Sequence, residues 1–483
     1  MNSVDKKALK AGTWYTICAF VLKGMSFITM PLFTRILSAA DVGMYSNLTS
    51  WITILSGIMT LDLHTSINLA HFQYRDDIYK YMSSIAVAGS VVTAIFYVGS
   101  IIFSEQITQL FGIPAYMLHV MLIYFLVNPA ILILHAKFRV CLQYKQTIIT
   151  SLIPAILSVV ISLLATIMTD KNKLQARVIG YYGVWIVFAV VLYIYVLYKG
   201  KSVKIEYIKF AVPVSIPLVV HALANTLLSS SDRIMIQKIC GPEYTAYYSI
   251  AYSCALVVSI LWSAISQAWT PWCCEMMHQK MYATIRKVIR PVLLLFSAGV
   301  LMLIMIAPEI LYILGGEEYM QAVYVIPPVM IGYIAQMLYT LYVNIEYYNR
   351  KQKQIMAGTL IAAAINIILN LIFIPIFGYI AAAYTTLVGY IVLLFVHYAF
   401  VRHMKLESIY DMKFNISLLL YAMACGIGIS LLYNRVVIRW IMISIIICVF
   451  VIIVASKKNQ IYKAIKEKDY IEMLKILHLM ERE

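Results

Sequence analysis

Charged residues are scarce in this chain of 483 residues: they make up 12% of it, while 62% of the residues are hydrophobic. The mean hydropathy is +0.84. A soluble domain carries far more charge on its surface, so solubility in water is excluded. The formal net charge is +16, which in a soluble protein would indicate nucleic acid as a partner. The distribution of these cations along the chain indicates a membrane and no nucleic acid.

Catalytic signatures are also missing. The sequence has no P-loop, no HExxH motif and no nucleophile elbow. The loops expected outside the membrane are too short for a catalytic domain. The eight cysteines show no metal-ligand spacing and are expected to be small packing residues. We therefore expect no enzymatic activity, no cofactor and no metal. The first apolar segment lacks a following cleavage site, so we expect it to remain as a helix.

Long apolar runs fill almost all of the sequence. A hydrocarbon core about 30 Å thick needs roughly 20 helical residues to cross it, and fourteen stretches reach that length. Short loops separate them. The expected fold is all-α and integral to the membrane, with about fourteen transmembrane helices. Their approximate ranges are 12–37, 42–70, 81–104, 116–136, 147–168, 178–198, 210–231, 244–270, 286–313, 319–348, 355–375, 379–401, 414–433 and 436–456.

The basic residues fall mainly on one side of this predicted topology. With the N-terminus inside, 29 Lys and Arg residues lie in inner segments and 8 in outer segments. This asymmetry is a strong positive-inside signal and predicts that both termini are cytoplasmic. The tail over 457–483 places apolar residues at helical spacing among Lys and Glu, which predicts an amphipathic helix at the membrane surface.

One lysine, Lys23, lies in the middle of the first apolar stretch, roughly 11 residues from either end. At that depth the side chain is too far from either surface to reach water fully, and an uncompensated charge in hydrocarbon is costly. We predict that Lys23 faces a wet cavity and binds an anionic group, for which a diphosphate suits its compact ammonium. The alternative is a buried structural ion pair.

Two outer turns of the chain resemble each other, one over 34–46 and the other over 232–249. Each has an arginine, an apolar pair, a turn of small residues or proline, an acidic residue and a Tyr-Ser pair. Arg35 and Arg233 are 198 positions apart, and Tyr45 and Tyr248 are 203 apart. A duplication of six helices with a small insertion would give these spacings. Because both turns lie on the outer side, the repeat is predicted to be parallel, about an axis along the membrane normal.

At these turns the chain resembles the polysaccharide flippases of the Wzx type. They belong to the MOP superfamily, which also contains the MATE exporters and the lipid II flippases. The resemblance rests on PLFTRIL at 31–37 with DVGMYS at 41–46, on SDR at 231–233 with YYSIAY at 247–252, and on IPIFGYIAAAY at 374–384. Together with the helix count it covers nearly the whole chain. Two departures are Thr245-Ala246 and Ala381, where the family usually has glycine.

The resemblance implies two six-helix lobes, at 1–200 and 201–405, with helices 13 and 14 at 406–456 and the cytoplasmic tail at 457–483. It also implies that undecaprenyl-diphosphate-linked oligosaccharide repeat units move from the inner to the outer leaflet of the bacterial cytoplasmic membrane by alternating access. The partners would be this glycan lipid, membrane lipids and the polysaccharide polymerase machinery.

Three other classes compete with this interpretation. A lipid II flippase is also a fourteen-helix carrier of a diphosphate lipid. Such flippases are expected to have a cluster of arginines in the membrane, whereas this chain has one central lysine. A MATE-type multidrug exporter would have about twelve helices and an acidic site for cationic drugs. A polysaccharide polymerase, which is an enzyme, would need a sizeable outer loop.

Polar residues recur at helical spacing in three of the predicted helices. These stripes either line a hydrated cavity for sugars or hold neighbouring helices together by hydrogen bonds. Their members are His221, Asn225, Ser229 and Asp232 in the seventh helix, Tyr248, Tyr252, Ser259, Ser263 and Ser266 in the eighth, and Thr49, Thr53, Ser56, Thr60 and His64 in the second.

Three further charged residues are candidates. Arg35 and Arg233, near the outer ends of their helices, either receive the diphosphate late in the cycle or anchor the outer interface. Asp62, near the inner end of the second helix, either pairs with a cation or takes up a coupling ion. The residues expected to bind substrate are Lys23, Arg35, His221, Asn225, Arg233, Tyr248 and Tyr252.

Overall fold

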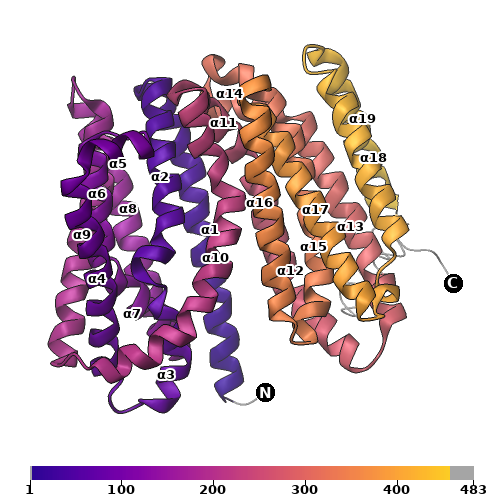
Figure 1. Ribbon diagram of the computed structural model, residues 1–483. Coiled ribbons are helices and arrows are strands. Elements are labelled where there is room, and N and C mark those ends of the chain that lie inside the picture. The colour runs from indigo at the N-terminus through magenta and orange to yellow at the C-terminus, as the bar shows by residue number, and fades with distance from the viewer. Residues whose placement is uncertain (1–2, 457–483) are drawn as a thin grey trace. The chain divides into compact units, whose positions relative to one another are not determined.

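The computed structural model describes residues 3–456, and every regular element within that range is a helix (Figure 1). The side chains of residues 3–9, 221, 449–451 and 453–456 lie outside the described part, as does the predicted tail helix over 457–483. The helices are α1 Ser3–Ile36, α2 Ala39–Thr60, η1 Leu63–Ser66, α3 Ile67–Gln73, α4 Ile78–Ile102, α5 Ser104–Phe111, α6 Ala115–Val127, α7 Pro129–Val140, α8 Tyr144–Met168, α9 Lys173–Gly200, α10 Ile205–Ile239, α11 Pro242–Cys254, α12 Leu256–His278, α13 Tyr282–Met305, α14 Ala307–Gly315, η2 Glu317–Val325, α15 Ile326–Tyr348, α16 Gln352–Phe377, α17 Ala381–His403, η3 Glu407–Ile409, α18 Met412–Ser430 and α19 Val436–Ser456.

Each of the fourteen predicted stretches overlaps one helix or two consecutive helices, except 42–70, which overlaps α2, η1 and α3. Within the described residues, 11 helices are long and apolar enough to cross a membrane, or up to 12 if the bent pair α11 and α12 forms one span. The helix α2 falls outside this set because Ser, Thr and Asn residues lower its hydropathy, and α19 counts only as a shorter apolar helix over Val436–Cys448. The all-α membrane fold is confirmed, and the count of fourteen stays a prediction.

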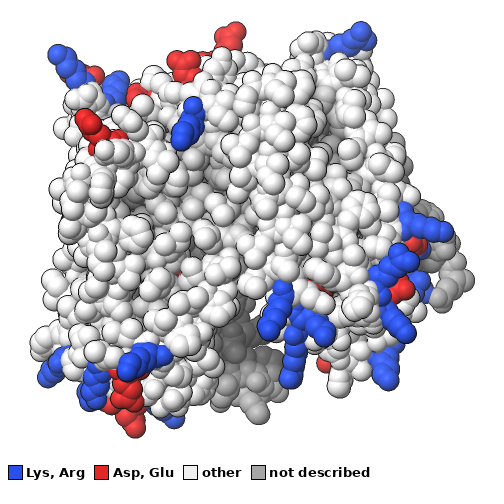
Figure 2. Space-filling model, in the orientation of Figure 1, with Lys and Arg blue, Asp and Glu red and all other residues white. Residues whose placement is uncertain are grey.

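The chain forms two compact units. The first unit comprises Met1–Ile250, Leu314–Gly316 and Asn370–Tyr379, and the second comprises Ala251–Ile313, Glu317–Leu369 and Ile380–Glu483. The predicted lobe boundary at residue 200 stays a prediction. On the face of the first unit that Figure 2 shows, charged side chains gather near the helix ends and leave a broad band almost without charge between them. This distribution suits a hydrocarbon environment around the middle of the helices.

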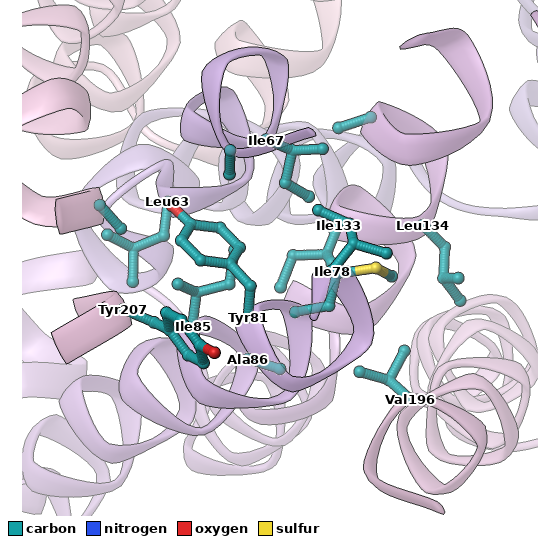
Figure 3. Close-up of a cluster of buried hydrophobic side chains, with 14 of the residues drawn as sticks. Leu63, Ile67, Ile78, Tyr81, Ile85, Ala86, Ile133, Leu134, Val196 and Tyr207 are labelled. Atoms are coloured by element: carbon teal, nitrogen blue, oxygen red, sulfur yellow. The ribbon is translucent and has the colours of Figure 1, made fainter. Parts of the chain in front are cut away.

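The first unit is held by clusters of buried apolar side chains. One cluster joins η1, α3, α4, α7, α9 and α10 around Tyr81 and Ile85, which are fully buried (Figure 3). The Tyr81 hydroxyl donates to Ser66 Oγ at 2.6 Å, so the phenol is paired despite its burial. A second cluster around Met117 and Phe125 joins α2, α6 and α9. The first cluster includes α10, the helix that carries Asn225 and Arg233.

The second unit is built around α15. Of the most apolar 18 residues of the segment Glu317–Tyr348, which includes this helix, 83% are buried. The neighbours of α15 are α12, α13, α17 and α18. The last helix, α19, is attached by an ion pair: the buried Arg439 guanidinium donates to both carboxylate oxygens of Glu309, at 2.5 and 2.7 Å, and to the Met305 carbonyl. Because a guanidinium in hydrocarbon requires such partners, this pair fixes where α19 packs.

At the start of α18, Asp411 is an N-cap that also forms an ion pair. Its Oδ1 accepts from the backbone amides of Lys413 and Phe414, at 3.1 and 3.3 Å. Its Oδ2 accepts from Arg290 Nη2 at 2.7 Å. Partial burial opposes ionisation, but the Phe414 amide and the Arg290 guanidinium outweigh it and hold the pKa of Asp411 below its ordinary value. The carboxylate therefore ties α18 to α13.

Candidate functional site

Lys23 lies on α1, a long apolar helix that is little buried. Among the candidate membrane helices described, it has the smallest buried share, 11% of its most apolar 18 residues, and its Trp14 stacks on Tyr144 of α8 with ring centroids 6.4 Å apart. The Lys23 side chain is exposed, and it lies between the exposed apolar residues Phe20 and Ile28. Its ammonium is therefore accessible from outside the first unit, and the predicted diphosphate-binding role stays a prediction.

Arg35 and Arg233 make the same local contact in the two repeats. Arg35 Nη1 donates to the Pro31 carbonyl at 3.2 Å, and Arg233 Nη1 donates to the Ser229 carbonyl at 3.2 Å. In each case the acceptor lies four residues earlier, near the C-terminal end of α1 or α10. The Arg35 side chain is exposed, whereas that of Arg233 is half-buried with its guanidinium 6.0 Å from the Tyr248 ring centre. The parallel repeat stays a prediction, as does substrate binding by either arginine.

The buried carboxylate of Asp232 connects three helices of the first unit. Asp232 and Tyr248 are both fully buried. Oδ2 of Asp232 accepts from the Tyr248 hydroxyl of α11 at 2.6 Å, and Oδ1 accepts from Asn370 Nδ2 of α16 at 2.7 Å. A buried carboxylate is tolerated only when its oxygens are paired in this way. Tyr248, predicted to bind substrate, is thus seen here in a buried network rather than at an open surface.

The repeated turns also contact each other. A Cβ on Gly43 of α2 would lie 1.7 Å from the Pro242 carbonyl oxygen and 3.1 Å from the Ala246 nitrogen, both of α11. Since no real Cβ fits at such distances, only glycine allows this close crossing. Gly43 and Ala246 occupy equivalent positions, three residues before Ser46 and Ser249. The departure from glycine at Ala246 is tolerated because its partner Gly43 supplies the space.

Asp62 marks a break that the sequence did not predict. The range 42–70 was expected to be one helix, but Leu61 and Asp62 have φ values of 49° and 41°, which end α2. Two successive left-handed residues without glycine cost roughly 1–2 kcal/mol each and are typical of functional sites. His64 Nδ1 lies 3.8 Å from Asp62 Oδ1. His64 no longer continues the polar stripe of α2, so that part of the prediction was wrong.

The remaining candidates are spread over the chain. Asn225 of α10 is exposed, and the side chain of His221 lies outside the described part. Tyr252 is buried in the second unit, with its ring 6.5 Å from that of Tyr333. The predicted stripe from Tyr248 to Ser266 is interrupted, because a 40° bend separates α11 from α12. Its members do not share one continuous helix face.

The stripe of α2 mainly bonds to its own helix. The hydroxyls of Thr49, Thr53, Ser56 and Thr60 donate to carbonyls three or four residues earlier. Such bonds satisfy hydroxyl groups in an apolar environment without any partner helix. A hydrated cavity along this face stays a prediction.

Two contacts of the second unit that involve buried polar side chains were missed, Glu346 with His397 and Arg439 with Glu309. Glu346 and His397 were overlooked because they lie near the ends of the ranges 319–348 and 379–401, where charge is expected at the membrane surface. Arg439 was counted as an outer basic residue for the same reason. The only sequence signal was their position inside, rather than between, the predicted stretches.

The helices, their apolar bands and these polar groups define a multi-pass helical membrane protein. Three solved structures are similar in fold. The lipid II flippase MurJ in an inward closed conformation has a TM-score of 0.67 at 14% identity, over 92% of this chain and 99% of that chain. An inward-facing MATE multidrug resistance transporter of the MOP superfamily has a TM-score of 0.55 at 14% identity, over 82% and 95%. A MOP superfamily transporter from Pyrococcus furiosus has a TM-score of 0.53 at 14% identity, over 83% and 96%.

The family follows from a separate match. The model of the polysaccharide biosynthesis protein family matches residues 8–277, more than half of the chain, and this chain belongs to that family. The resemblance to the polysaccharide flippase family is thereby confirmed, and the fold is similar to that of solved MOP superfamily transporters. No protein with curated annotation matches the sequence.

Proposed function

We propose that this protein moves an undecaprenyl-diphosphate-linked oligosaccharide repeat unit from the inner to the outer leaflet of the bacterial cytoplasmic membrane by alternating access. The observation that carries the proposal is the family match over residues 8–277, joined to the fold similarity with MurJ over almost the whole chain. The family places the protein in polysaccharide biosynthesis, and the fold is that of a transporter. A lipid-linked glycan is a substrate that fits both the polysaccharide biosynthesis family and a fold shared with transporters.

Lys23 is the proposed contact for the diphosphate. An exposed ammonium in the middle of a membrane helix persists only where an anion or water stabilises it, and a diphosphate supplies both charge and hydrogen-bond acceptors. Arg35 and Arg233 are proposed to receive the same group at the outer side. Both termini are proposed to be cytoplasmic, from the 29 to 8 distribution of basic residues.

Export of lipid II is the second candidate, favoured by the TM-score of 0.67 with MurJ. Under this alternative the glycan is the peptidoglycan precursor, and the diphosphate contact at Lys23 is unchanged. A MATE-type exporter of cationic drugs is less well supported, because a central lysine would repel such substrates.

A deletion strain distinguishes these functions. Loss of the gene should leave lipid-linked repeat units of a surface polysaccharide accumulated in the membrane, and surface polysaccharide should disappear while peptidoglycan synthesis continues. Accumulation of lipid II with arrested peptidoglycan synthesis would support the second candidate instead. Unchanged pools of both lipids would contradict the proposed function.

A further inference from the structure

The second unit contains a carboxylate and an imidazole that are both fully buried. Glu346 lies near the C-terminal end of α15 and His397 lies on α17, and each side chain is 0% exposed. His397 Nδ1 lies 3.0 Å from Oε1 and 3.0 Å from Oε2 of Glu346. An ionised carboxylate only accepts hydrogen bonds. Two equal distances therefore fit an Nδ1–H that donates to both oxygens.

The other nitrogen of the imidazole has a different environment. Among the described residues, Nε2 of His397 is buried and has no hydrogen-bond partner. The backbone of α16 lies against this edge, because a Cβ on Gly358 would be 2.9 Å from Nε2 and 2.8 Å from Cε1. Tyr339 stacks on the imidazole, with centroids 5.7 Å apart, and the Phe400 ring meets it edge-on at 6.2 Å. The ring is thus fixed in place, with one nitrogen unused.

The groups around the pair are mainly neutral. Tyr339 faces it from α15 and is itself stacked on Tyr390 of α17. Tyr342 of α15 directs its hydroxyl to Asn415 of α18, which donates to it at 3.0 Å, and its ring contacts Tyr398 of α17. Two titratable groups of the helices packed on α15 are engaged elsewhere: Cys273 of α12 contacts the Tyr410 hydroxyl, and Arg290 of α13 pairs with Asp411.

The charge of the pair depends on one proton. With Nδ1 protonated and Nε2 bare, the imidazole is neutral and the pair carries the charge of the Glu346 carboxylate alone. A proton from water that binds Nε2 makes an imidazolium, and the pair becomes neutral overall. The N–H bond forms as an O–H bond of a hydronium ion breaks, and a water molecule is released. Because an uncompensated buried charge is costly in a membrane, these two states differ in how well they fit the closed packing seen here.

We propose that Glu346 and His397 form a proton-binding site that takes up one proton at His397 Nε2 and couples it to the packing of α16 against α17. In the protonated state Nε2 becomes a donor that needs an acceptor, and the α16 backbone at Gly358 is the surface it meets. Proton uptake and release therefore bias two arrangements of these helices. Applied to the flippase cycle, this rests on the proposed function: the site supplies a coupling proton for transport.

The direct test is nitrogen NMR on the purified full-length protein, labelled with 15N-histidine, in lipid nanodiscs. His397→Gln identifies the signal of His397, and His403→Gln identifies that of the exposed histidine at the end of the same helix. In a titration from about pH 9 down to about pH 5, we expect His397 Nε2 to change from bare to protonated while Nδ1 stays protonated. A His397 signal that stays constant over this range would overturn the proposal. Glu346→Gln should shift the transition by at least one pH unit, and an unshifted transition would also contradict it.

Transport in the complemented deletion strain gives the second readout. Glu346→Gln and His397→Gln should reduce translocation roughly tenfold and remove its dependence on pH, whereas His403→Gln should leave both unchanged. Gly358→Ala should shift the NMR transition of His397, because the added methyl group closes the space beside Nε2. A normal NMR titration in a protein that moves no glycan lipid would refute the proposed function and leave the proton site intact. Wild-type, pH-dependent transport by His397→Gln would refute the coupling.

Discussion

At the residue scale, the most informative side chains are cations and carboxylates inside apolar helices. Lys23 and Asp232 were both visible in the sequence, because each interrupts or ends an apolar run. The partners of Asp232 were only half visible: Tyr248 was singled out, but Asn370 lies 138 positions away and no local pattern connects them. The pairing of Glu346 with His397 could not be predicted from the sequence for the same reason, because only helix packing brings these two residues together.

Replacement of Lys23 tests the proposed diphosphate contact. Lys23→Ala should lower surface polysaccharide to below about a tenth of the wild-type level, because no other ammonium lies at that depth of the first predicted helix. Lys23→Arg should retain part of the activity, since the charge survives while reach and geometry change. The measurement is polysaccharide output from a deletion strain at matched protein level. Lys199→Ala, at the exposed end of α9, serves as the control and should be neutral. Wild-type output from Lys23→Ala would remove this residue from the mechanism.

At the element scale, the sequence predicted where helices lie better than where they break. The breaks at Leu61–Asp62 and at Ala255 contain neither glycine nor proline, which are the usual sequence signals of a helix end. Prolines did not help either, because Pro154, Pro213 and Pro217 lie inside continuous helices. In a membrane, neighbouring helices can satisfy the backbone groups that such residues free. Helix packing thus decides the breaks.

Gly43 tests the crossing of the two repeated turns. Gly43→Ala places a methyl group where the Pro242 carbonyl lies, and should destabilise the first unit by about 1–3 kcal/mol. The matched control is Gly99→Ala in α4, where an added Cβ meets nothing within 4 Å. The two variants are compared by the thermal unfolding of the purified proteins, which is measured as the loss of monodisperse protein on heating. Equal stability of both would show that α2 and α11 are not in close contact in the membrane.

Asp411 tests the attachment of α18. Asp411→Ala should cost about 1 kcal/mol through loss of the helix cap, whereas Asp411→Asn should retain the cap and lose only the ion pair with Arg290. The pKa of Asp411 is lowered in the folded protein, so its ionic contribution is present above the ordinary carboxyl pKa of about 4. It is lost as the pH falls through the lower folded value.

The difference in thermal stability between wild type and Asp411→Asn should therefore be constant near neutral pH and shrink in acid. A difference that grows as the pH falls would contradict the assigned sign.

At the scale of the whole molecule, the composition and the long apolar runs predicted an all-α membrane protein. An apolar run of about 20 residues crosses a membrane as a helix, because a helix satisfies all its backbone groups within itself. The positions of the spans followed from the same runs. The arrangement of helices into units could not be derived, because it depends on side-chain packing between segments far apart in the sequence. The parallel repeat stays a prediction: its sequence signal is short, and the hydrogen bonds of Arg35 to Pro31 and of Arg233 to Ser229 each lie within a single helix.

The predicted topology is tested with reporter fusions. A fusion at Lys457 should report the cytoplasm and one at Gly315 the exterior, because 29 basic residues lie in inner segments and 8 in outer ones. At each position, one fusion carries an enzyme that is active only outside the cell, and another carries a protein that fluoresces only inside it. The ratio of the two signals gives the side of the membrane. The same side for both positions would contradict fourteen spans with cytoplasmic termini.

The central claim is that this chain carries a lipid-linked glycan outward across the membrane. The most direct measurement uses right-side-out vesicles in which the repeat unit is radiolabelled on its undecaprenyl-diphosphate carrier, with a membrane-impermeant glycosidase added outside. Vesicles with the wild-type protein should release labelled sugar at a rate that rises with protein content, and vesicles with Lys23→Ala should release it only at the background rate of protein-free membranes. Release that is the same with and without the protein would contradict the account.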